Sequence, residues 1–251
     1  IRAMWKKRGL QGINNGIPLC KISGIQIRLD YSWFIIFALV TWSLSAGYFP
    51  RQFPRLDVSS YWIAGIIASI LFFFSIILHE LMHSIIALKL GIKIRSITLF
   101  IFGGATHLSR EAKTPRKEFW IALSGPLASV FLGLTIWGAA MIIRDDVSPI
   151  IVSVFHYLAW INVFLGIFNL VPAFPLDGGR ILRAIAWWKT GNPAYAIRLS
   201  TDLGKGFSIA VIGIGVIQIF TGSLLAGIWL SLIGLFLRSM AYAGMHEFEI
   251  R

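Results

Sequence analysis

Residues 60–88 read SYWIAGIIASILFFFSIILHELMHSIIAL, and this stretch decides the class of fold. It is long enough and apolar enough to cross a bilayer as one helix, yet it contains His79, Glu80 and His83. The two histidines are four residues apart, so on a helix their side chains leave the same face one turn apart. That spacing suits two corners of a tetrahedral zinc site, with Glu80 beside the metal to act on its water. Ionisable residues at membrane depth are costly and usually functional, so the stretch predicts a metalloenzyme site inside the bilayer.

The composition supports a membrane protein along the whole chain. Of 251 residues, 57% are hydrophobic and only 14% are charged, whereas soluble domains are about 25% charged. We therefore predict an all-α polytopic membrane protein with about six transmembrane helices. A single long tilted helix is the alternative for the last two spans, because residues 206–237 carry no charge. The predicted spans are 31–49, 60–88, 117–143, 149–188 with an interruption, 203–220 and 223–242.

The formal net charge of +12 has a topological explanation. If the N-terminus is cytoplasmic, 20 of the 23 Lys and Arg residues fall in cytoplasmic segments and three, Arg51, Arg55 and Arg144, fall outside. Cytoplasmic loops of membrane proteins are rich in Lys and Arg. Nucleic-acid binding is therefore not needed to explain the charge, and we expect a multi-pass protein, in the inner membrane of a prokaryote, with a cytoplasmic N-terminus.

Two segments on the predicted cytoplasmic side have the patterns of strands. Apolar and polar residues alternate over 25–29, and residues 92–102 are rich in β-branched and aromatic residues and end at Gly103 and Gly104. These patterns predict a small β-sheet or hairpin at the cytosolic face of the membrane. Juxtamembrane loops with incidental alternation are the alternative.

A third metal ligand is offered by residues 169–180, NLVPAFPLDGGR. Pro172 and Pro175 must break a helix, and irregular backbone at membrane depth is tolerated where it lines a cavity or packs inside protein. Asp177 follows the break, with Gly178 and Gly179 allowing close approach of backbone. A proton relay or a counter-ion is the alternative role for Asp177.

Depth in the membrane favours a shared site. With a rise of about 1.5 Å per residue, His83 and His79 lie roughly 9 and 15 Å below Lys89, and Asp177 lies roughly 9 Å below Arg183. Three protein ligands leave the fourth zinc position for water, toward which Glu80 can act as general base. Asn169 can hydrogen-bond the oxyanion or, alternatively, satisfy carbonyls freed by Pro172.

The paired motifs resemble the site-2 protease family of intramembrane zinc metalloproteases. The matching residues are HELMH at 79–83, Asn169, Pro172, Asp177 and Gly178, the FGG turn at 102–104 and the SGP segment at 124–126. The resemblance covers about residues 16–240. It implies that His79, His83 and Asp177 bind one Zn²⁺ ion and that Glu80 is the catalytic base. It also implies that the strand around Gly103 pairs with an unwound substrate segment, so Leu99, Ile101, Gly103 and Gly104 are the expected substrate-binding residues.

The resemblance also sets expectations for organisation and partners. We expect a cytosolic arm and strand at 1–30, a transmembrane protease domain at 31–242 and a cytosolic tail at 243–251. The branch that it resembles most carries cystathionine-β-synthase domains after the last span, and these are not in this sequence. The expected partners are a transmembrane substrate protein, the lipid bilayer and, as a further possibility, a second copy of the chain. The expected function is regulated intramembrane proteolysis; a membrane ion or metal transporter and an inactive substrate-binding homologue are the alternatives.

Three other polar residues stand out in the sequence, and of these His107 is a candidate fourth ligand. His107 follows the glycine turn in a basic loop, so we expect a surface residue there. His156 lies near the outer end of its span, where an interfacial position explains it, and Asn162 can hydrogen-bond between helices.

Overall fold

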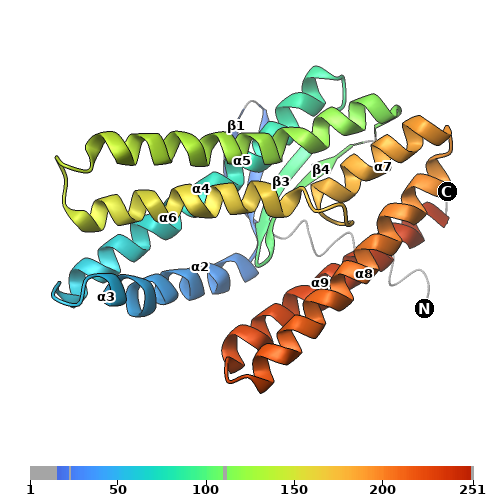
Figure 1. The fold of residues 1–251 in the computed structure, drawn as a ribbon. Coiled ribbons are helices and arrows are strands. Elements are labelled where there is room, and N and C mark those ends of the chain that lie inside the picture. The colour runs from blue at the N-terminus through green and yellow to red at the C-terminus, as the bar shows by residue number, and fades with distance from the viewer. Residues whose placement is uncertain (1–15, 23, 110–111, 250–251) are drawn as a thin grey trace. The chain divides into compact units, whose positions relative to one another are not determined.

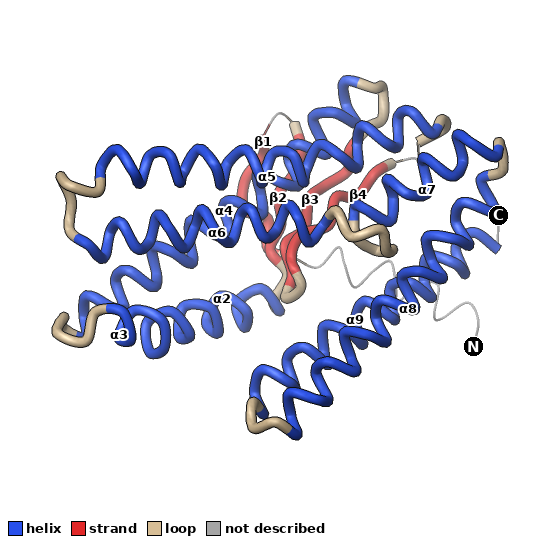
Figure 2. Tube along the Cα trace, in the orientation of Figure 1, coloured by secondary structure: helices blue, strands red, loops and turns tan. Residues whose placement is uncertain are grey.

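The computed structural model describes residues 16–22, 24–109 and 112–249 of the chain. Part of the predicted N-terminal arm (1–15) and Arg110 of the basic loop lie outside the described residues. Helices dominate, and the strands are gathered into one small sheet (Figure 1, Figure 2). In chain order the elements are β1 (Ile17–Ile22), β2 (Ile25–Leu29), α2 (Ser32–Ser43), η2 (Leu44–Tyr48), α3 (Phe49–Gln52), α4 (Val58–Lys89), β3 (Ile94–Phe100), β4 (Gly103–Leu108), α5 (Pro115–Ile143), α6 (Pro149–Asn169), α7 (Asp177–Thr190), α8 (Pro193–Phe220) and α9 (Leu224–Glu249).

Six helical segments among the described residues are long and apolar enough to cross a membrane. This confirms the predicted number of spans. The last two are separate helices, α8 and α9, because the chain turns at Thr221 and Gly222, where Gly222 adopts a φ of 95°. The fourth predicted span is interrupted as expected: α6 ends at Asn169 and α7 begins at Asp177.

The sheet has four strands in the order β1-β2-β3-β4. The central pair, β2 and β3, is parallel, and both outer pairs are antiparallel. The alternation over 25–29 therefore does form a strand, while β1 was not predicted. Residues 92–102 form β3 and its turn, and Gly103 begins β4 after a turn at Ile101 and Phe102.

For Leu99 and Ile101 to pair with a substrate segment, as expected, they would have to lie on an exposed edge of the sheet, and they do not. Strand β3 is paired on both sides, with Leu99 opposite Leu29 of β2 and opposite Gly104 of β4. Leu99 is 1% exposed, and its carbonyl accepts a hydrogen bond from the Asp30 N–H at 2.8 Å. Ile101 lies in the turn. The sequence pattern marks an apolar strand correctly, but strand order depends on contacts between distant segments.

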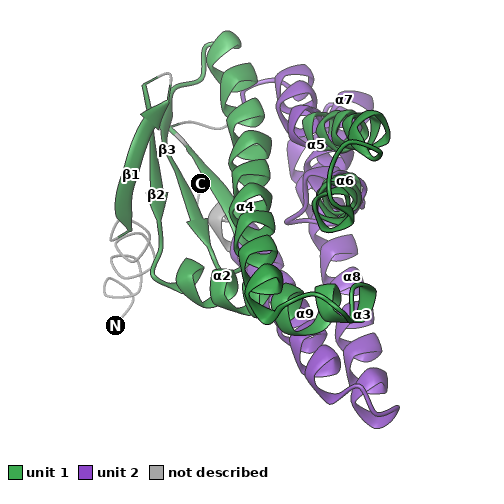
Figure 3. Cartoon of the chain, turned by 90° about the vertical axis from the view of Figure 1, so that its left-hand side faces the viewer, with its two compact units in different colours: residues 1–111, 127–165 green, residues 112–126, 166–251 purple. Residues whose placement is uncertain are grey.

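The chain divides into two compact units (Figure 3). Unit 1 contains residues 1–111 and 127–165, and in it the sheet packs against α4. Its core joins sheet residues to α4 through Ile27, Leu29 and Leu99 on one side and Phe73, Ile76 and Ile77 on the other. The part of α4 that packs against the sheet extends to Ile77, close to Glu80. This packing brings β4 into contact with Glu80.

A buried amide ties α6 to α4 within unit 1. Asn162 is 0% exposed, and its Nδ2 donates to Ser75 Oγ at 3.1 Å and to the Leu158 carbonyl at 2.8 Å. This confirms the expectation that Asn162 hydrogen-bonds between helices.

Unit 2 contains residues 112–126 and 166–251, with α7 packed on α8 and α8 beside α9. The irregular segment between α6 and α7 belongs to this unit. Its Phe174 N–H donates to the Ser200 carbonyl of α8 at 3.2 Å. The break predicted from the two prolines is thus held by protein packing, as irregular backbone in a membrane requires.

Candidate metal centre

His79 and His83 lie together on the buried face of α4. Each is 4% exposed, and their Nε2 atoms are 3.2 Å apart. The spacing of four residues produces this arrangement, because successive turns of a helix present such side chains on one face. Two imidazole nitrogens at this separation can converge on one metal ion.

The other ring nitrogen of His79 is held by a residue outside the predicted motifs. His79 Nδ1 lies 2.9 Å from Ser129 Oγ, and Ser129 on α5 is 2% exposed. A metal-binding histidine usually has such a partner on its second nitrogen, which fixes the ring orientation and the tautomer. Ser129 therefore orients the ring so that Nε2 of His79 faces Nε2 of His83.

Asp177 is the first residue of α7 and is 8% exposed. The two glycines that follow it are needed for space: a Cβ on Gly178 would lie 2.2 Å from the Leu170 carbonyl oxygen, and one on Gly179 would lie 2.3 Å from Phe174 N. Arg180 Nη1 lies 3.4 Å from Asp177 Oδ1. The predicted close approach of backbone at these glycines is confirmed.

Among the described residues, His79, His83 and Asp177 form a group that could hold a metal ion. Each offers one ligand atom, and these atoms all lie within 4.8 Å of one another. Two imidazoles and one carboxylate are a donor set that suits zinc and leaves a position open. The residues present therefore fit the zinc ion that the sequence predicts.

Glu80 is half-buried and is contacted by β4 of the sheet. Thr106 Oγ1 donates to Glu80 Oε2 at 2.7 Å. A Cβ on Gly104 would lie 2.6 Å from Glu80 Cγ, so this position has room for glycine alone as long as Glu80 keeps its conformation. The adjacent Gly103 differs, since its φ of 130° is the reason for a glycine at the turn.

Asn169, the remaining predicted site residue, is half-buried at the end of α6. Its predicted role in binding an oxyanion stays a prediction.

His107 is not a residue of a basic surface loop, as was expected, but lies on β4 opposite Ser96. Burial lowers the pKa of its imidazole, Arg95 lowers this pKa further, and Glu80 opposes the shift. His107 Nε2 is buried without a hydrogen-bond partner.

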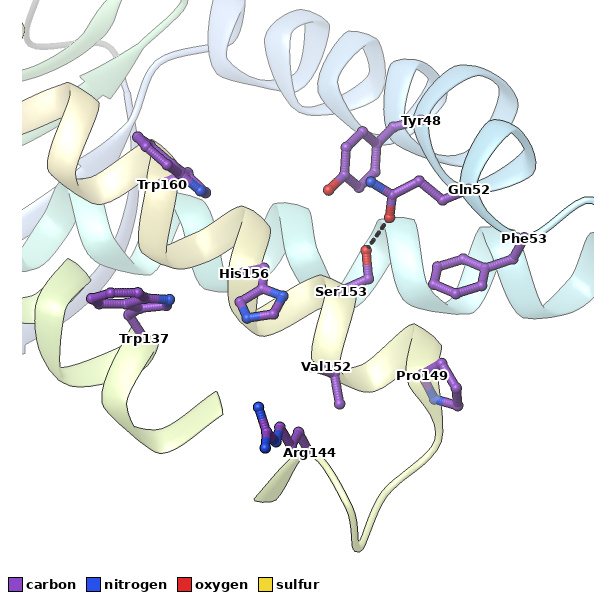
Figure 4. A pocket seen from close by; sticks show the side chains of 10 residues that line it. All are labelled: Tyr48, Gln52, Phe53, Trp137, Arg144, Pro149, Val152, Ser153, His156 and Trp160. Carbon is purple, nitrogen blue, oxygen red and sulfur yellow. Dashed lines mark hydrogen bonds between the residues drawn. The ribbon is translucent and has the colours of Figure 1, made fainter. Parts of the chain in front are cut away.

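His156 lines a cavity of about 510 Å³ in unit 1 together with Arg144 and Trp160 (Figure 4). Two other residues that line this cavity are hydrogen-bonded to each other: Ser153 Oγ donates to Gln52 Oε1 at 2.7 Å. None of the candidate metal ligands lines this cavity.

Ser129 and Thr106 are not identified by the sequence motifs, although each has a weak signal. Ser129 is the last residue of the segment SGPLAS, on the span that carries the SGP motif. Thr106 is two residues after Gly104, so on a strand both point to the same face. Neither signal identifies the partner, because His79 and Glu80 lie on α4, whereas Ser129 lies on α5 and Thr106 on β4.

The membrane-length helices, the small sheet and the His-His-Asp group together define a multi-pass membrane protein with a candidate metal site. The chain belongs to Peptidase family M50, whose model matches residues 67–147 and 138–212. This confirms the family predicted from the motifs.

Individual relatives agree with this assignment. A candidate zinc metalloprotease of Synechocystis sp. is 39% identical over 97% of this chain, and one named Rip3 of Mycobacterium tuberculosis is 35% identical over 95% of it. The chain spans 63% and 60% of the length of these two relatives. A solved site-2 protease from Methanocaldococcus jannaschii is similar in fold, with a TM-score of 0.62 and 29% identity over 92% of this chain and 95% of that one.

Proposed function

We propose that this chain is an intramembrane zinc metalloprotease that hydrolyses a peptide bond in a transmembrane segment of a membrane-anchored regulatory protein. The observation that carries the proposal is the group of two buried histidines and a buried aspartate, with Glu80 directly beside His79 in sequence. Membership of Peptidase family M50 and the zinc metalloprotease names of the relatives support it.

Each site residue has a role that follows from its chemistry. His79, His83 and Asp177 would hold zinc, which when bound acts as a Lewis acid that activates water and polarises a peptide carbonyl. Glu80 accepts the proton of the attacking water and then delivers it to the leaving amine, as a general base that becomes a general acid. Asn169 donates its amide hydrogen to the oxyanion that develops on the carbonyl oxygen.

The substrate segment must be extended when it is cut, because a helix shields its peptide groups with internal hydrogen bonds. Within the described part of the chain, strand β4 pairs with β3 and is the last strand of the sheet. Its outer edge can supply main-chain hydrogen bonds to an extended peptide. We therefore propose that Gly103 and Gly104 of β4 bind substrate, and that Leu99 and Ile101 support this strand from β3 and the turn.

The function is tested with Glu80→Gln and with alanine variants of the three ligands. The purified chain should contain about one zinc ion, by elemental analysis, since three ligands and an open position describe one catalytic site. Glu80→Gln should retain zinc and lose cleavage of a single-span reporter between two fluorescent proteins. His79→Ala, His83→Ala and Asp177→Ala should lose zinc. Cleavage by Glu80→Gln at the wild-type rate would contradict the proposal.

The edge-pairing part of the proposal has a separate test. Proline at Ala105 of β4 removes a main-chain donor and disturbs the strand, so cleavage should fall while zinc stays bound. Helix-breaking residues in the reporter segment should speed its cleavage, because they lower the cost of unwinding. If neither change alters the rate, edge pairing is wrong, although the zinc assignment would survive.

A further inference from the structure

The carboxylate of Glu80 is contacted by a strand that is remote from it in sequence. Thr106 Oγ1 lies 2.7 Å from Glu80 Oε2, but 3.4 Å from the Glu80 carbonyl oxygen and 3.5 Å from Ser84 Oγ. The Ser84 hydroxyl donates to the Glu80 carbonyl at 2.9 Å. The single hydroxyl proton of Thr106 therefore goes to the carboxylate, because that acceptor is nearest and is charged.

Gly104 restricts the same side chain from the same face of β4. A Cβ at this position would lie 2.6 Å from Glu80 Cγ, 3.1 Å from Cδ and 3.2 Å from Oε1. Unlike Gly103, Gly104 has no backbone dihedral that requires glycine. Glycine is therefore needed at position 104 because a larger residue would collide with the Glu80 side chain. Two residues later on the same strand, Thr106 donates a hydrogen bond to the Glu80 carboxylate.

The backbone behind these two residues is firmly held. Gly104 is opposite Leu99 and Thr106 is opposite Ile97 on β3. Leu99 is 1% exposed and Ile97 is 0% exposed, and β3 is itself paired with β2. A hydroxyl on such a strand is a fixed donor, so it limits the positions that the flexible Glu80 side chain can adopt.

We propose that Thr106 and Gly104 are positioning residues for Glu80. Thr106 fixes the carboxylate by a charge-assisted hydrogen bond, and Gly104 provides the space that this conformation of Glu80 needs. The inference rests on the proposed function, in which Glu80 is the base. By this inference, β4 has two roles: its edge binds the substrate, and its residues position Glu80. Because both roles belong to one strand, that strand fixes the distance from Glu80 to a peptide paired with it.

The test compares Thr106→Val with Thr106→Ser in the full chain. Valine keeps the shape and removes the donor, whereas serine keeps the donor. For the single-span reporter, Thr106→Val should lower kcat by about 10- to 100-fold, the range expected for loss of a hydrogen bond to a charged group, with KM and zinc content unchanged. Thr106→Ser should restore kcat to within about threefold of the wild type. Ser109→Ala is the matched control, since it removes an exposed hydroxyl that donates to the Lys93 carbonyl at 2.7 Å.

A binding measurement keeps this test independent of proteolysis. Acetohydroxamate binds zinc and gives a proton or hydrogen bond to a carboxylate placed beside the metal. Its affinity for the zinc-loaded chain, measured by calorimetry, should fall in Thr106→Val and recover in Thr106→Ser. In Gly104→Ala the new Cβ displaces Glu80, so acetohydroxamate affinity should fall there as well, with zinc still bound.

The outcomes separate the inference from the function on which it rests. A wild-type chain that binds acetohydroxamate in a Thr106-dependent way without cutting the reporter would support the positioning role and contradict the protease. Unchanged acetohydroxamate affinity in both Thr106→Val and Gly104→Ala would overturn the positioning role. Equal loss of kcat in Thr106→Val and Thr106→Ser would also overturn it, because the hydroxyl would then not be the cause.

Discussion

Ser129 holds His79 by Nδ1, at 2.9 Å, and so directs Nε2 of the same ring toward His83. Removal of such a partner commonly lowers metal affinity by about 10- to 100-fold. We expect Ser129→Ala to weaken zinc binding by about tenfold or more, measured by competition with a chromogenic chelator. Thr135→Ala is the control, since its exposed hydroxyl on α5 bonds within the helix to the Phe131 carbonyl. Equal zinc affinity in Ser129→Ala and the wild type would mean that packing alone orients the imidazole.

His107 provides a prediction about pH at the residue scale. Burial lowers the pKa of its imidazole below the usual value of 6.5. The unfolded chain therefore binds the proton at a higher pH than the folded chain does, so stability decreases as the pH falls from about 6.5 toward the folded pKa. We expect His107→Gln to lose less stability over this range than the wild type in a detergent-based unfolding assay. The same slope in both proteins would contradict the predicted shift.

At the scale of elements, a buried ion pair joins the first turn of α5 to α7 within unit 2. Arg183 Nε donates to Glu118 Oε1 at 2.7 Å, and Arg183 Nη2 contacts the same oxygen. The Glu118 side chain is 4% exposed and that of Arg183 is 21% exposed. This pair anchors α7, the helix that begins with Asp177.

Breaking this pair should be costly, because it leaves a charge without a partner. We expect Glu118→Ala to destabilise the chain by about 3–5 kcal/mol, measured by unfolding in detergent. Replacing both partners, as Glu118→Leu with Arg183→Met, should recover most of this loss because no buried charge remains. A double variant as unstable as Glu118→Ala would mean that shape at these positions, rather than charge, is decisive.

At the scale of the whole molecule, the distribution of Lys and Arg predicts the orientation in the membrane. We expect the N-terminus and the 89–117 segment to face the cytoplasm. In a Cys20→Ser background, which removes the one cysteine of this sequence, Arg55→Cys should react with a membrane-impermeant thiol reagent added outside intact cells. Lys113→Cys should react only after the cells are opened. Labelling of Lys113→Cys from outside would reverse the proposed topology.

The number of spans and the three candidate metal ligands could be predicted because their signals are local. Helix length and apolarity do not depend on partners, and the spacing of His79 and His83 specifies one helix face. The break at Pro172 and Pro175 is likewise a property of the residues themselves. The expected orientation likewise rests on the distribution of Lys and Arg along the sequence and on no contact, and it stays a prediction.

The strand order and the supporting contacts depended on the tertiary structure. The residue pattern of an apolar strand is the same whether one or both of its edges are paired with other strands. The sequence therefore does not show that Leu99 of β3 is paired with β4. The partners Ser129 and Thr106 are 50 and 26 residues from the side chains they hold. The sequence by itself therefore determined the membrane class, the spans and the candidate ligands, since these follow from the composition and spacing of single segments. Only the folded chain decided which strand is the edge and which hydroxyls hold His79 and Glu80, because those contacts arise from packing between segments that are distant in sequence.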